Sequence, residues 1–567
     1  MLSFVRIKHL ERILSGFLLL LLAGLFYLQI LEGKLYRSQS RENIIRFVPI
    51  QAPRGDISDR NGVLLADHRL TFDVAIIPQE TENLTRLLER LSGLVGVERE
   101  KLLRAYSKNF STPFMPVKVI EDLDKEKAII LEERRDLPGM VVLITPRRHY
   151  AYGPETVHLL GVVGEISSDE LDRLHPYGYR IKDLLGRGGI EESFDNYLRG
   201  GDGNIQLKVN NKGYKVATLG YRAAEKGKDL TLTIDIRLQD FIYSLFKDKR
   251  GVVCVMNPAN GEILALVSSP SFDPNGDFSE SFVEEGKPFL NRATQGLYPP
   301  GSTFKVAVGS MALEEKVIYG GTSFPCTGSL RLGKDTFKCW KEGGHGEQHV
   351  IEALRHSCNV FFYHVGLLSG ADRIAEYARF FGFGEKSGIE LPHEASGLVP
   401  TPLWKRLAKR EGWYDGDTVN FAIGQGYFSV TPLQVLRMAS VIATDGKLVA
   451  PHVIKQIGTV EVKSSVKRSL PLSEKTLSVV REGMIEVVNA PDGTGRYAGV
   501  PGLEIAGKTG TAQVPGKNSH AWFVGFSPIR NPHVSLVVLV EHGGMGGLAA
   551  SQIASSVFEK MKELELL

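Results

Sequence analysis

The feature that most constrains this chain is an apolar run at residues 13–31, which contains no charged side chain. At a rise of about 1.5 Å per residue, a helix of this length spans nearly all of the ~30 Å hydrocarbon core of a membrane. A cleavable signal peptide has a shorter apolar region and small residues at its end, whereas bulky residues such as Phe26 and Tyr27 stand here. A buried core helix is the alternative, and we expect an uncleaved transmembrane anchor.

The charges beside the anchor do not decide its orientation, because each flank carries basic side chains. They are Arg6, Lys8 and Arg12 before the run, and Lys34, Arg37 and Arg41 after it. Residues 1–12 are short enough to form a cytoplasmic stub, and no second apolar run of comparable length follows. We therefore expect a single-pass protein of the bacterial cytoplasmic (inner) membrane, with its remaining residues in the periplasm.

Composition excludes several classes of protein. With 567 residues, the chain is long enough for about three to four folding units. An apolar share of 43% with 23% charged residues excludes a disordered chain and a membrane protein with many spans. The net charge of +3 does not favour a nucleic-acid partner, and four cysteines are too few for a disulfide-built scaffold.

The chain beyond the anchor falls into two regions. Residues 46–222 mix short β-like runs with charged helical stretches, which predicts an elongated mixed domain. In residues 223–567, apolar runs at 251–256 and 263–267 flank a turn and predict a β-hairpin, and the run at 534–540 predicts a further strand. We therefore expect an α+β fold, with a mainly antiparallel sheet that is built from both ends of the second region and flanked by helices.

A candidate nucleophile lies at the start of a predicted helix. Ser302 follows Pro299, Pro300 and Gly301, and an apolar helical stretch follows it. Free N–H groups at a helix start favour developing negative charge, and Lys305 lies one turn further on the same face. A serine hydroxyl needs a base to become a nucleophile, and a lysine with a lowered pKa is such a base. Alone, this pattern more often marks a helix cap.

Two further motifs strengthen the catalytic interpretation. Ser357 and Asn359 lie between two apolar helical stretches, and Lys508 follows an alternating, strand-like run. On a strand, Lys508 and Gly510 share one face, so that glycine leaves room for the backbone of an acyl substrate. Lys508 can hold a carboxylate, or it can supply the cation that lowers the pKa of a second lysine.

Together, Ser-x-x-Lys at Ser302, Ser-x-Asn at Ser357 and Lys-Thr-Gly at Lys508 resemble the active site of penicillin-recognising serine enzymes. The surrounding sequence is similar to the transpeptidase domain of class B penicillin-binding proteins. Upstream, residues 53–57 and 189–191 resemble the pedestal, or dimerisation-like, domain of that family. The resemblance covers nearly the whole chain, anchor included, and implies a penicillin-binding transpeptidase domain at residues 223–567.

The resemblance also implies a function and residue roles. The protein would be a serine-type D-Ala-D-Ala carboxypeptidase/transpeptidase that cross-links peptidoglycan stem peptides. Ser302 would attack the stem peptide with Lys305 as base, while Ser357 and Asn359 relay protons and contact the substrate. Lys508, Thr509 and Thr511 would bind the substrate carboxylate, and Gly510 is a further implied substrate-binding residue. The N–H groups of Ser302 and Thr511 would form an oxyanion hole.

Partners follow from the same resemblance. They are peptidoglycan stem peptides, β-lactams as covalent inhibitors, and a membrane glycan polymerase of the elongation machinery. A β-lactamase would need an efficient deacylating base, and a membrane β-lactam sensor would need a signalling segment, for which we find no pattern in the sequence. The division-specific transpeptidase of the same family is a further alternative.

A second motif points to a different function, nucleotide binding. Residues 502–509 match the phosphate-loop pattern Gly-x4-Gly-Lys-Thr. That pattern needs a strand before its first glycine and a helix after its threonine. Here a loop rich in glycine and proline precedes it, and the four intervening residues alternate as in a strand. We therefore expect neither nucleotide nor nucleic acid as a partner.

Three cysteines and one histidine form a candidate metal site. Cys326, Cys339, His345 and Cys358 offer a complete tetrahedral set of zinc ligands. The alternatives are a disulfide between Cys326 and Cys339, or buried thiols. The disulfide would leave Cys358 unpaired, so we favour structural Zn²⁺ that would support the neighbouring Ser357 and Asn359. Such a site also resembles penicillin-binding protein 2, the elongation branch of the family, whereas Cys254 is expected to be a core thiol.

Overall fold

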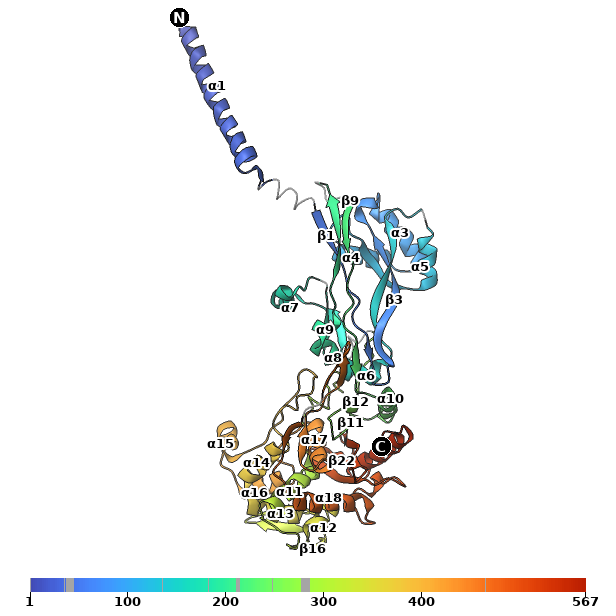
Figure 1. The fold of residues 1–567 in the computed structure, drawn as a ribbon, viewed down its shortest axis with the longest axis vertical. Helices are drawn as coiled ribbons and strands as arrows, with labels where there is room; N and C mark the ends of the chain where they lie inside the picture. Colours follow the sequence, from blue (N-terminus) through green and yellow to red (C-terminus); the bar gives the residue numbers. More distant parts are fainter. Residues whose placement is uncertain are drawn as a thin grey trace. The chain divides into compact units, whose positions relative to one another are not determined.

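The computed structural model describes residues 2–34, 36, 45–134, 136–181, 183–210, 215–246, 248–276, 286–463 and 466–567. The chain divides into two compact units (Figure 1). Unit 1 consists of Met1–Arg54, His68–Arg147 and Arg199–Gly227, and unit 2 consists of Gly55–Asp67, Arg148–Leu198 and Lys228–Leu567.

The predicted anchor is helical. Helix α1 (Leu2–Phe26) continues into a π-helical turn at Tyr27–Leu31. The stretch His9–Leu31 is long and apolar enough to cross a membrane, and none of it is buried against other residues. Apolar side chains that do not pack against other parts of the protein are stable in the hydrocarbon core of a membrane. This agrees with the anchor expected from the sequence.

Unit 1 is built from strands and short helices. One sheet has the antiparallel order β1 (Ile45–Ile50), β8 (Gly203–Val209), β9 (Lys215–Arg222). In a second sheet, β3 (Leu64–Ile76) pairs with β4 (Val117–Leu123) and β5 (Met140–Tyr150). Helices α3 (Leu84–Val95), α4 (Arg99–Asn109) and α5 (Lys125–Glu132) accompany it. Apolar side chains of β3 and α3 form the core of this unit.

A five-stranded antiparallel sheet is the centre of unit 2. Its order is β12 (Ile263–Ser269), β11 (Gly251–Met256), β23 (Val534–Val540), β22 (Lys517–Ser527), β21 (Ala506–Val514). The expected hairpin is thus β11 and β12, and strands from both ends of the region share one sheet. These findings confirm the predicted α+β class.

Helices cover both faces of this sheet. Val253 and Val255 of β11 pack in one core with α10 (Ile236–Ser244) and α19 (Ala549–Glu563). Val252 and Cys254 pack in the other core, with the helices of residues 305–443. A strand buried on both faces reads as a continuous apolar run, which is why the sequence of β11 does not alternate. Cys254 is fully buried there and its pKa is raised by burial, as expected of a core thiol.

The remaining elements of unit 2 surround the sheet. The longer helices are α6 (Gly153–Leu160), α11 (Lys305–Glu314), α13 (Asn359–Ser369), α14 (Ala371–Phe380), α15 (Pro402–Lys409), α16 (Asp415–Ala422), α17 (Pro432–Ala443) and α18 (Glu474–Asn489). Short paired strands include β6 (Val162–Glu165) with β7 (Leu184–Arg187) and β13 (Phe324–Cys326) with β16 (Gly346–Gln348).

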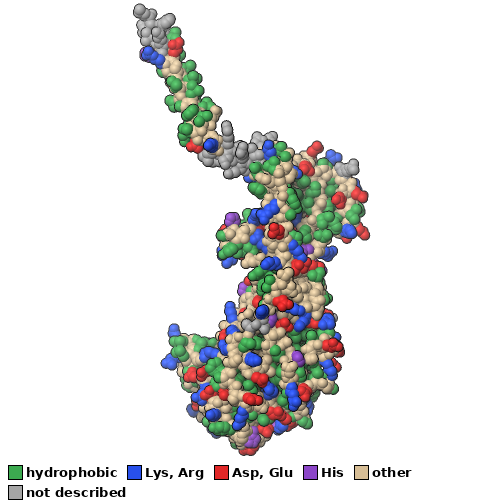
Figure 2. All heavy atoms as spheres, in the orientation of Figure 1, with side chains coloured by type: hydrophobic (Ala, Val, Ile, Leu, Met, Phe, Trp, Pro, Cys, Tyr) green, Lys and Arg blue, Asp and Glu red, His purple; other side chains and the backbone are tan. Residues whose placement is uncertain are grey.

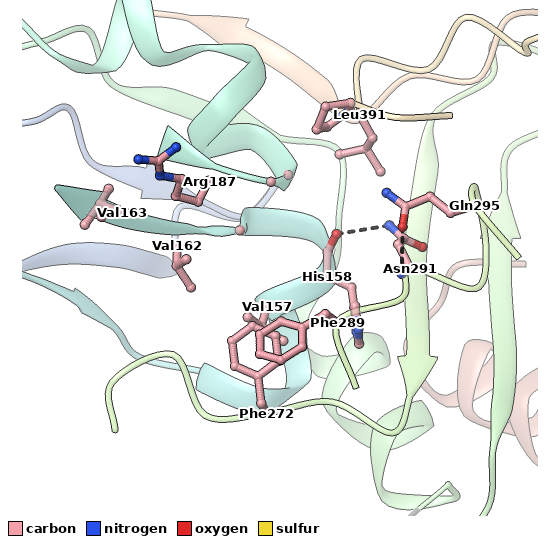
Figure 3. A pocket seen from close by; sticks show the side chains of 15 residues that line it. Val157, His158, Val162, Val163, Arg187, Phe272, Phe289, Asn291, Gln295 and Leu391 are labelled. Carbon is pink, nitrogen blue, oxygen red and sulfur yellow. Dashed lines mark hydrogen bonds between the residues drawn. The ribbon is translucent and has the colours of Figure 1, made fainter. Parts of the chain in front are cut away.

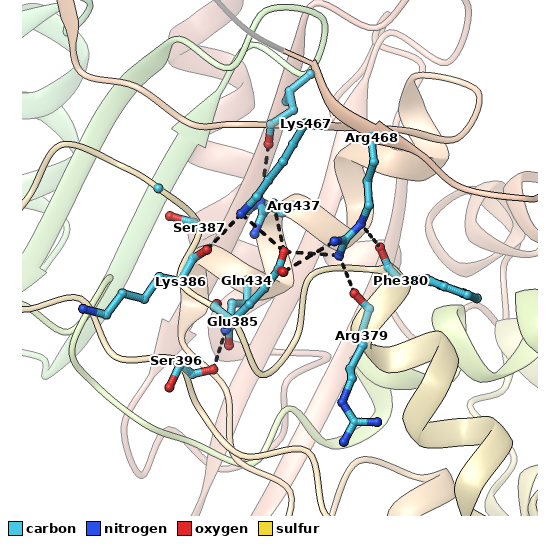
Figure 4. Close-up of polar contacts among 12 residues, drawn as sticks. Arg379, Phe380, Glu385, Lys386, Ser387, Ser396, Gln434, Arg437, Lys467 and Arg468 are labelled. Atoms are coloured by element: carbon cyan, nitrogen blue, oxygen red, sulfur yellow. Dashed lines mark hydrogen bonds and ion pairs between the residues drawn. The ribbon is translucent and has the colours of Figure 1, made fainter.

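An ion cluster holds helix α17 in place (Figure 4). Arg437 of α17 is buried, and its guanidinium lies 3.8 Å from the carboxylate of Glu385. The same carboxylate pairs with Lys467 at 3.5 Å and Arg468 at 3.2 Å. Burial lowers the pKa of Arg437 to about 10, so its charge persists at neutral pH. The cluster thereby ties α17 to the loop that follows α14.

Candidate active site and cysteine cluster

Ser302 lies in a tight turn between two other segments of the chain. The turn is a 3-10 helix at Gly301–Phe304 that leads directly into α11, and Ser302 is half-buried in it. The N–H of Gly301 donates to the carbonyl of Gly424 at 2.9 Å. Gly301 has φ +55°, and a Cβ at this position would come within 2.8 Å of the carbonyl oxygen of Thr511. Glycine at 301 therefore lets the turn pack against strand β21.

Lys305 brings the first two motifs together. Its buried Nζ donates to the carbonyl of Ser357 at 2.8 Å and to Oδ1 of Asn359 at 2.7 Å, and it lies 3.4 Å from Oγ of Ser357. Burial lowers the pKa of Lys305 to about 8, although the nearby thiols of Cys358, Cys339 and Cys326 act in the opposite direction. A neutral amine uses two N–H bonds for these two carbonyl oxygens, so its lone pair can accept a proton from a hydroxyl.

Lys508 brings the third motif to the same place. Its Nζ donates to Oγ of Ser357 at 3.0 Å and to the carbonyl of Thr509 at 3.0 Å. Burial, and then the charge of Lys305, lower the pKa of Lys508 well below its ordinary value. The hydroxyl of Ser357 therefore lies between two amines, and the sequence-predicted Lys305, Ser357, Asn359 and Lys508 form one cluster.

Ser357 has an unusual backbone conformation that the sequence did not indicate. It lies between α12 (Val350–Arg355) and α13, with φ +52°, in the left-handed region that few serines adopt. This conformation turns the chain between the two helices, so that both the carbonyl and the hydroxyl of Ser357 face the Lys305 amine. Backbone strain of this kind is found where the surrounding structure imposes a special geometry.

Strand β21 passes directly along the turn that contains Ser302. A Cβ on Gly510 would come within 2.9 Å of Cγ2 of Thr303 and 3.1 Å of the carbonyl oxygen of Pro300. The absence of a side chain at residue 510 is therefore what allows the third motif to approach Ser302. Thr511 is anchored separately, because its Oγ1 accepts the N–H of Gly546 at 3.2 Å.

We expect Gly510→Ala to slow acylation by benzylpenicillin by about 100-fold, because the added methyl group must push β21 away from the turn and even a ~1 Å displacement is costly. The measurement is the second-order acylation rate of the variant and of Gly321→Ala. A Cβ at Gly321 meets nothing within 4 Å, so this control should react like the wild type. A Gly510→Ala variant that reacts at the wild-type rate would contradict the close approach.

A loop before β21 contributes contacts that sequence analysis missed. Oγ1 of Thr509 donates to Oγ1 of Thr494 at 3.0 Å, and Oγ1 of Thr494 donates to the carbonyl of Arg355 at 3.1 Å. Thr494 thus links the third motif to the helix that precedes Ser357. A threonine between two glycines has no distinctive pattern, and no sequence signal could have identified it.

Only the second half of the run that matches the phosphate-loop pattern lies on a strand, because residues 503–505, which were expected to be strand-like, precede it. β21 begins at Ala506 and continues to Val514, and it pairs with β22 from Ala506 opposite Phe526 to Val514 opposite Lys517. No helix starts after Thr509. The backbone therefore lacks the strand-loop-helix arrangement by which a phosphate loop holds its ligand.

The three cysteines and His345 converge beside the second motif. Their four ligand atoms all lie within 4.8 Å of one another. Nδ1 of His345 is 3.5 Å from Sγ of Cys326 and 3.6 Å from Sγ of Cys339. Tetrahedral zinc, with bonds of about 2.3 Å to sulfur and 2.0 Å to nitrogen, separates these two kinds of ligand by about 3.5 Å. All cysteines in the described part of the chain are free thiols, so the donor set fits zinc.

Cys358 ties this cluster to the motif cluster. It is the N-cap residue of α13, directly between Ser357 and Asn359. The thiol of Cys358 hydrogen-bonds to Cys339, which holds the pKa of Cys339 far below the usual range of a thiol. A bond from the sulfur of Cys358 to a metal would therefore hold Ser357 and Asn359, the two residues that contact Lys305, in position.

A cavity of ≈490 Å³ lies elsewhere in unit 2 (Figure 3). Val157, Val162, Phe272, Phe289 and Leu391 line it, together with polar residues that include Arg187, Asn291 and Gln295. The rings of Phe272 and Phe289 pack against each other with centroids 4.4 Å apart. None of its lining residues belongs to the three motifs, so the cavity is separate from the candidate active site.

Comparison with known proteins agrees with this geometry. The penicillin-binding protein transpeptidase domain matches residues 251–560, and the penicillin-binding protein dimerisation domain matches residues 49–232. The peptidoglycan D,D-transpeptidase MrdA of Haemophilus influenzae is 33% identical, over 97% of this chain and 91% of that protein.

Two solved structures are similar over most of their length. One is a complex between penicillin-binding protein 2 and MreC from Helicobacter pylori, with a TM-score of 0.83, 33% identity, and coverage of 92% of this chain and 99% of that chain. The other is a peptidoglycan synthase complex that coordinates polymerization and crosslinking, with a TM-score of 0.73, 30% identity, and coverage of 98% and 97%. With its dimerisation domain, its transpeptidase domain and three converging motifs, the chain belongs to the class B penicillin-binding proteins.

Proposed function

We propose that this protein is a peptidoglycan D,D-transpeptidase of the elongation branch, penicillin-binding protein 2. The observation that carries the proposal is the position of the Ser357 hydroxyl between the Nζ atoms of Lys305 and Lys508, beside a nucleophile turn packed on β21. Two amines, a hydroxyl and an edge strand at one place can activate a serine and align an extended peptide.

The reaction has two steps in this arrangement. Oγ of Ser302 attacks the carbonyl carbon of the penultimate D-alanine, and its proton passes to the neutral amine of Lys305. The bond to the terminal D-alanine breaks, and that leaving nitrogen takes a proton through Ser357. An amine of a neighbouring stem peptide then attacks the acyl-enzyme, which forms the cross-link and returns the proton to Ser302.

Other residues bind the substrate. Lys508, Thr509 and Thr511 hold the terminal carboxylate, and Gly510 leaves room for the peptide backbone along β21. The N–H groups of Ser302 and Thr511 stabilise the oxyanion of the tetrahedral intermediate, and removing one such donor typically costs about 10²–10³ in kcat. β-Lactams acylate Ser302 in place of the stem peptide.

The direct test uses the full-length protein with a synthetic pentapeptide that ends in D-Ala-D-Ala. We expect release of D-alanine and formation of cross-linked dimers, both detected by mass spectrometry and both blocked by prior treatment with penicillin. Turnover that persists after penicillin treatment, or a penicillin adduct that the protein hydrolyses rapidly as a β-lactamase does, would contradict the proposal.

The rate of acylation should depend on pH through Lys305. Since the pKa of Lys305 is lowered to about 8 and only the neutral amine accepts a proton, the rate should rise from pH 6 to a plateau above pH 8. Well below pH 8 the expected change is about tenfold per pH unit. Stopped-flow acylation by benzylpenicillin measures this profile, with thermal melting at each pH as the control. A flat profile would contradict the assignment of Lys305 as base.

We also propose that Cys326, Cys339, His345 and Cys358 bind one structural Zn²⁺ ion. The metal would supply a rigid cross-link between β13, the loop around residue 345 and the start of α13. The convergence of four soft or borderline ligand atoms within 4.8 Å supports this proposal. No step of the acyl transfer passes through the metal.

The anchor and the partners complete the proposal. Helix α1 holds the protein in the cytoplasmic membrane, with residues 46–222 as pedestal and residues 223–567 as transpeptidase domain in the periplasm. MreC and a membrane glycan polymerase are the proposed partners, supported by the complexes of similar proteins. Protease added to spheroplasts should digest both domains, and digestion only after lysis would contradict this orientation.

A further inference from the structure

A buried polar cluster lies between the end of strand β23 and the chain that leads into Ser302. Oε1 of Glu541, the first residue after β23, accepts the O–H of Tyr298 at 2.7 Å and the Nε–H of Arg292 at 2.8 Å. The same guanidinium donates to two backbone carbonyls, at 2.6 and 3.2 Å. We call Arg292, Tyr298 and Glu541 the Glu541 cluster.

The cluster is shielded from water. Figure 2 shows acidic and basic side chains interspersed over the face of the molecule that it displays, and exposed ion pairs contribute little to stability. In the Glu541 cluster, only 3% of the Arg292 side chain and 14% of the Glu541 side chain are exposed. Burial acts to raise the pKa of Glu541, but the hydrogen bond from Tyr298 and the charge of Arg292 outweigh it and lower the pKa. Glu541 is therefore an ionised acceptor, which strengthens both hydrogen bonds.

The ring of Tyr298 lies against strand β22. Its centroid is 5.4 Å from that of His520 and 6.2 Å from that of Trp522, and both contacts are edge-to-face. Trp522 is the residue of β22 that pairs with Gly510 of the third motif. The backbone of Tyr298 exchanges two hydrogen bonds of 2.9 Å with Val430. Tyr298 is thus held by its ring, by its backbone and, through the Glu541 cluster, by its hydroxyl.

The chain from Tyr298 to Ser302 is short and stiff. Three residues separate the two, and the first two of them are Pro299 and Pro300. Because proline fixes φ near −65°, this stretch has little freedom to compensate for a change at its start. A displaced Tyr298 would therefore move the turn that contains Ser302.

The loop that begins with Glu541 also reaches the third motif. The N–H of Gly546 donates to Oγ1 of Thr511 at 3.2 Å. A Cβ at Gly546 would collide with the carbonyl oxygen of Gly510, so this part of the loop packs directly on β21. One loop thus contacts the residues before Ser302 at its start and the third motif at its end.

We infer that Glu541 is a positioning residue for acyl transfer, which sets the position of the Ser302 turn relative to β21 through the hydroxyl of Tyr298. The inference rests on the proposed function and adds to it a residue outside the three motifs. The side-chain hydrogen bonds of Glu541 go to Tyr298 and Arg292. Glu541 therefore acts on the geometry with which Ser302 attacks, and the initial binding of a β-lactam does not depend on it.

The test measures acylation of the full-length protein by benzylpenicillin in a stopped-flow instrument, which gives the dissociation constant Kd and the acylation rate constant k2 separately. Tyr298→Phe removes only the hydroxyl, and Glu541→Ala removes its acceptor. Glu541→Gln keeps an oxygen acceptor for the hydroxyl but removes the charge beside Arg292. A further variant combines Tyr298→Phe with Glu541→Ala.

The chain offers a matched control for the loss of the hydroxyl. The O–H of Tyr377 donates to Oε1 of Glu315 at 2.8 Å, and Arg373 lies 3.6 Å from the other oxygen of that carboxylate. These three residues lie outside the three motifs, and Tyr377 is buried like Tyr298. Both Tyr→Phe changes should therefore lower the melting temperature by a similar few degrees. Only Tyr298→Phe should change k2.

We expect Tyr298→Phe and Glu541→Ala each to lower k2 about tenfold and to leave Kd within twofold of the wild type. A displacement of ~1 Å costs about 100-fold, and the remaining contacts of Tyr298 should limit the shift to less than that. In the double variant k2 should stay close to that of the single variants, because both changes remove the same contact. Glu541→Gln should keep k2 within about threefold of the wild type, although its melting temperature falls.

The outcomes separate this inference from the proposed function. If the wild type is acylated and releases D-alanine, but Tyr298→Phe keeps the k2 of Tyr377→Phe, the inference is wrong and the proposed function stands. Losses that multiply in the double variant would also overturn it, as would an equal loss of k2 in Glu541→Gln and Glu541→Ala. Should Glu541→Ala not fold, the comparison of Tyr298→Phe with Tyr377→Phe decides. A wild type that neither releases D-alanine nor forms a penicillin adduct would overturn the proposed function itself.

Discussion

Ser302→Ala is expected to abolish covalent labelling by a fluorescent penicillin. In the proposed mechanism the acyl bond forms with the Ser302 oxygen, and replacing a catalytic serine nucleophile lowers rates by about 10⁴–10⁶-fold. The fold should not change, because the turn is held by Gly301 and by its backbone bond to Gly424, neither of which involves the serine hydroxyl. Intact-mass spectrometry with peptide mapping should place the wild-type adduct on the peptide that contains Ser302.

Two controls make this result decisive. Ser323→Ala removes an exposed serine outside the candidate site and should label like the wild type. Thermal melting of Ser302→Ala should stay within a few degrees of the wild type, which excludes unfolding as the cause of lost labelling. A Ser302→Ala protein that still carries the adduct would show that another residue is the nucleophile.

Loss of the cysteine cluster is expected to have the second-largest effect. Purified wild-type protein should contain one zinc ion per chain, and Cys358→Ser should lower metal content and thermal stability together. Removal of a ligand to structural zinc commonly costs several kcal/mol, so we expect the melting temperature to fall by about 5–10 °C. Because Cys358 lies between Ser357 and Asn359, the rate of acylation by penicillin should fall as well.

Metal analysis separates this effect from simple loss of packing. Cys254→Ala removes a buried thiol from β11, outside the cluster, and should reduce stability without changing the zinc content. Chelation of the wild type should reproduce the effect of Cys358→Ser. Metal-free wild-type protein of full stability would contradict the zinc proposal, and a mass loss of two hydrogen atoms would instead indicate a disulfide between Cys326 and Cys339.

Local sequence patterns predicted those helices and strands in which every residue has the same kind of surroundings. The apolar run at residues 13–31 predicted α1, and the paired runs around residues 251–267 predicted the β11–β12 hairpin. Helix α1 is apolar on all sides over a length that can span a membrane, and β11 is buried on both faces of its sheet. In both cases a continuous run of apolar residues is enough to predict the element. The family-typical motifs identified the residues of the candidate site, and their catalytic roles stay predictions.

Contacts between distant segments were not predictable in the same way. Thr494 links Thr509 to Arg355, but it has no pattern in its own neighbourhood. The same is true of Ser357, whose left-handed backbone depends on how two helices meet. The Thr494 contact arises from packing between segments more than 100 residues apart in the chain.

The amino-acid sequence by itself determined which chemical groups are present: one membrane-length helix, a hydroxyl beside a lysine, a second lysine on a strand, and four side chains of types that can bind a metal. Only the tertiary structure decided that Lys305 and Lys508 both reach the hydroxyl of Ser357, because this requires the sheet to bring β21 against the turn that contains Ser302. Burial then lowers the pKa of both amines, since the charged form loses its hydration when the protein encloses it.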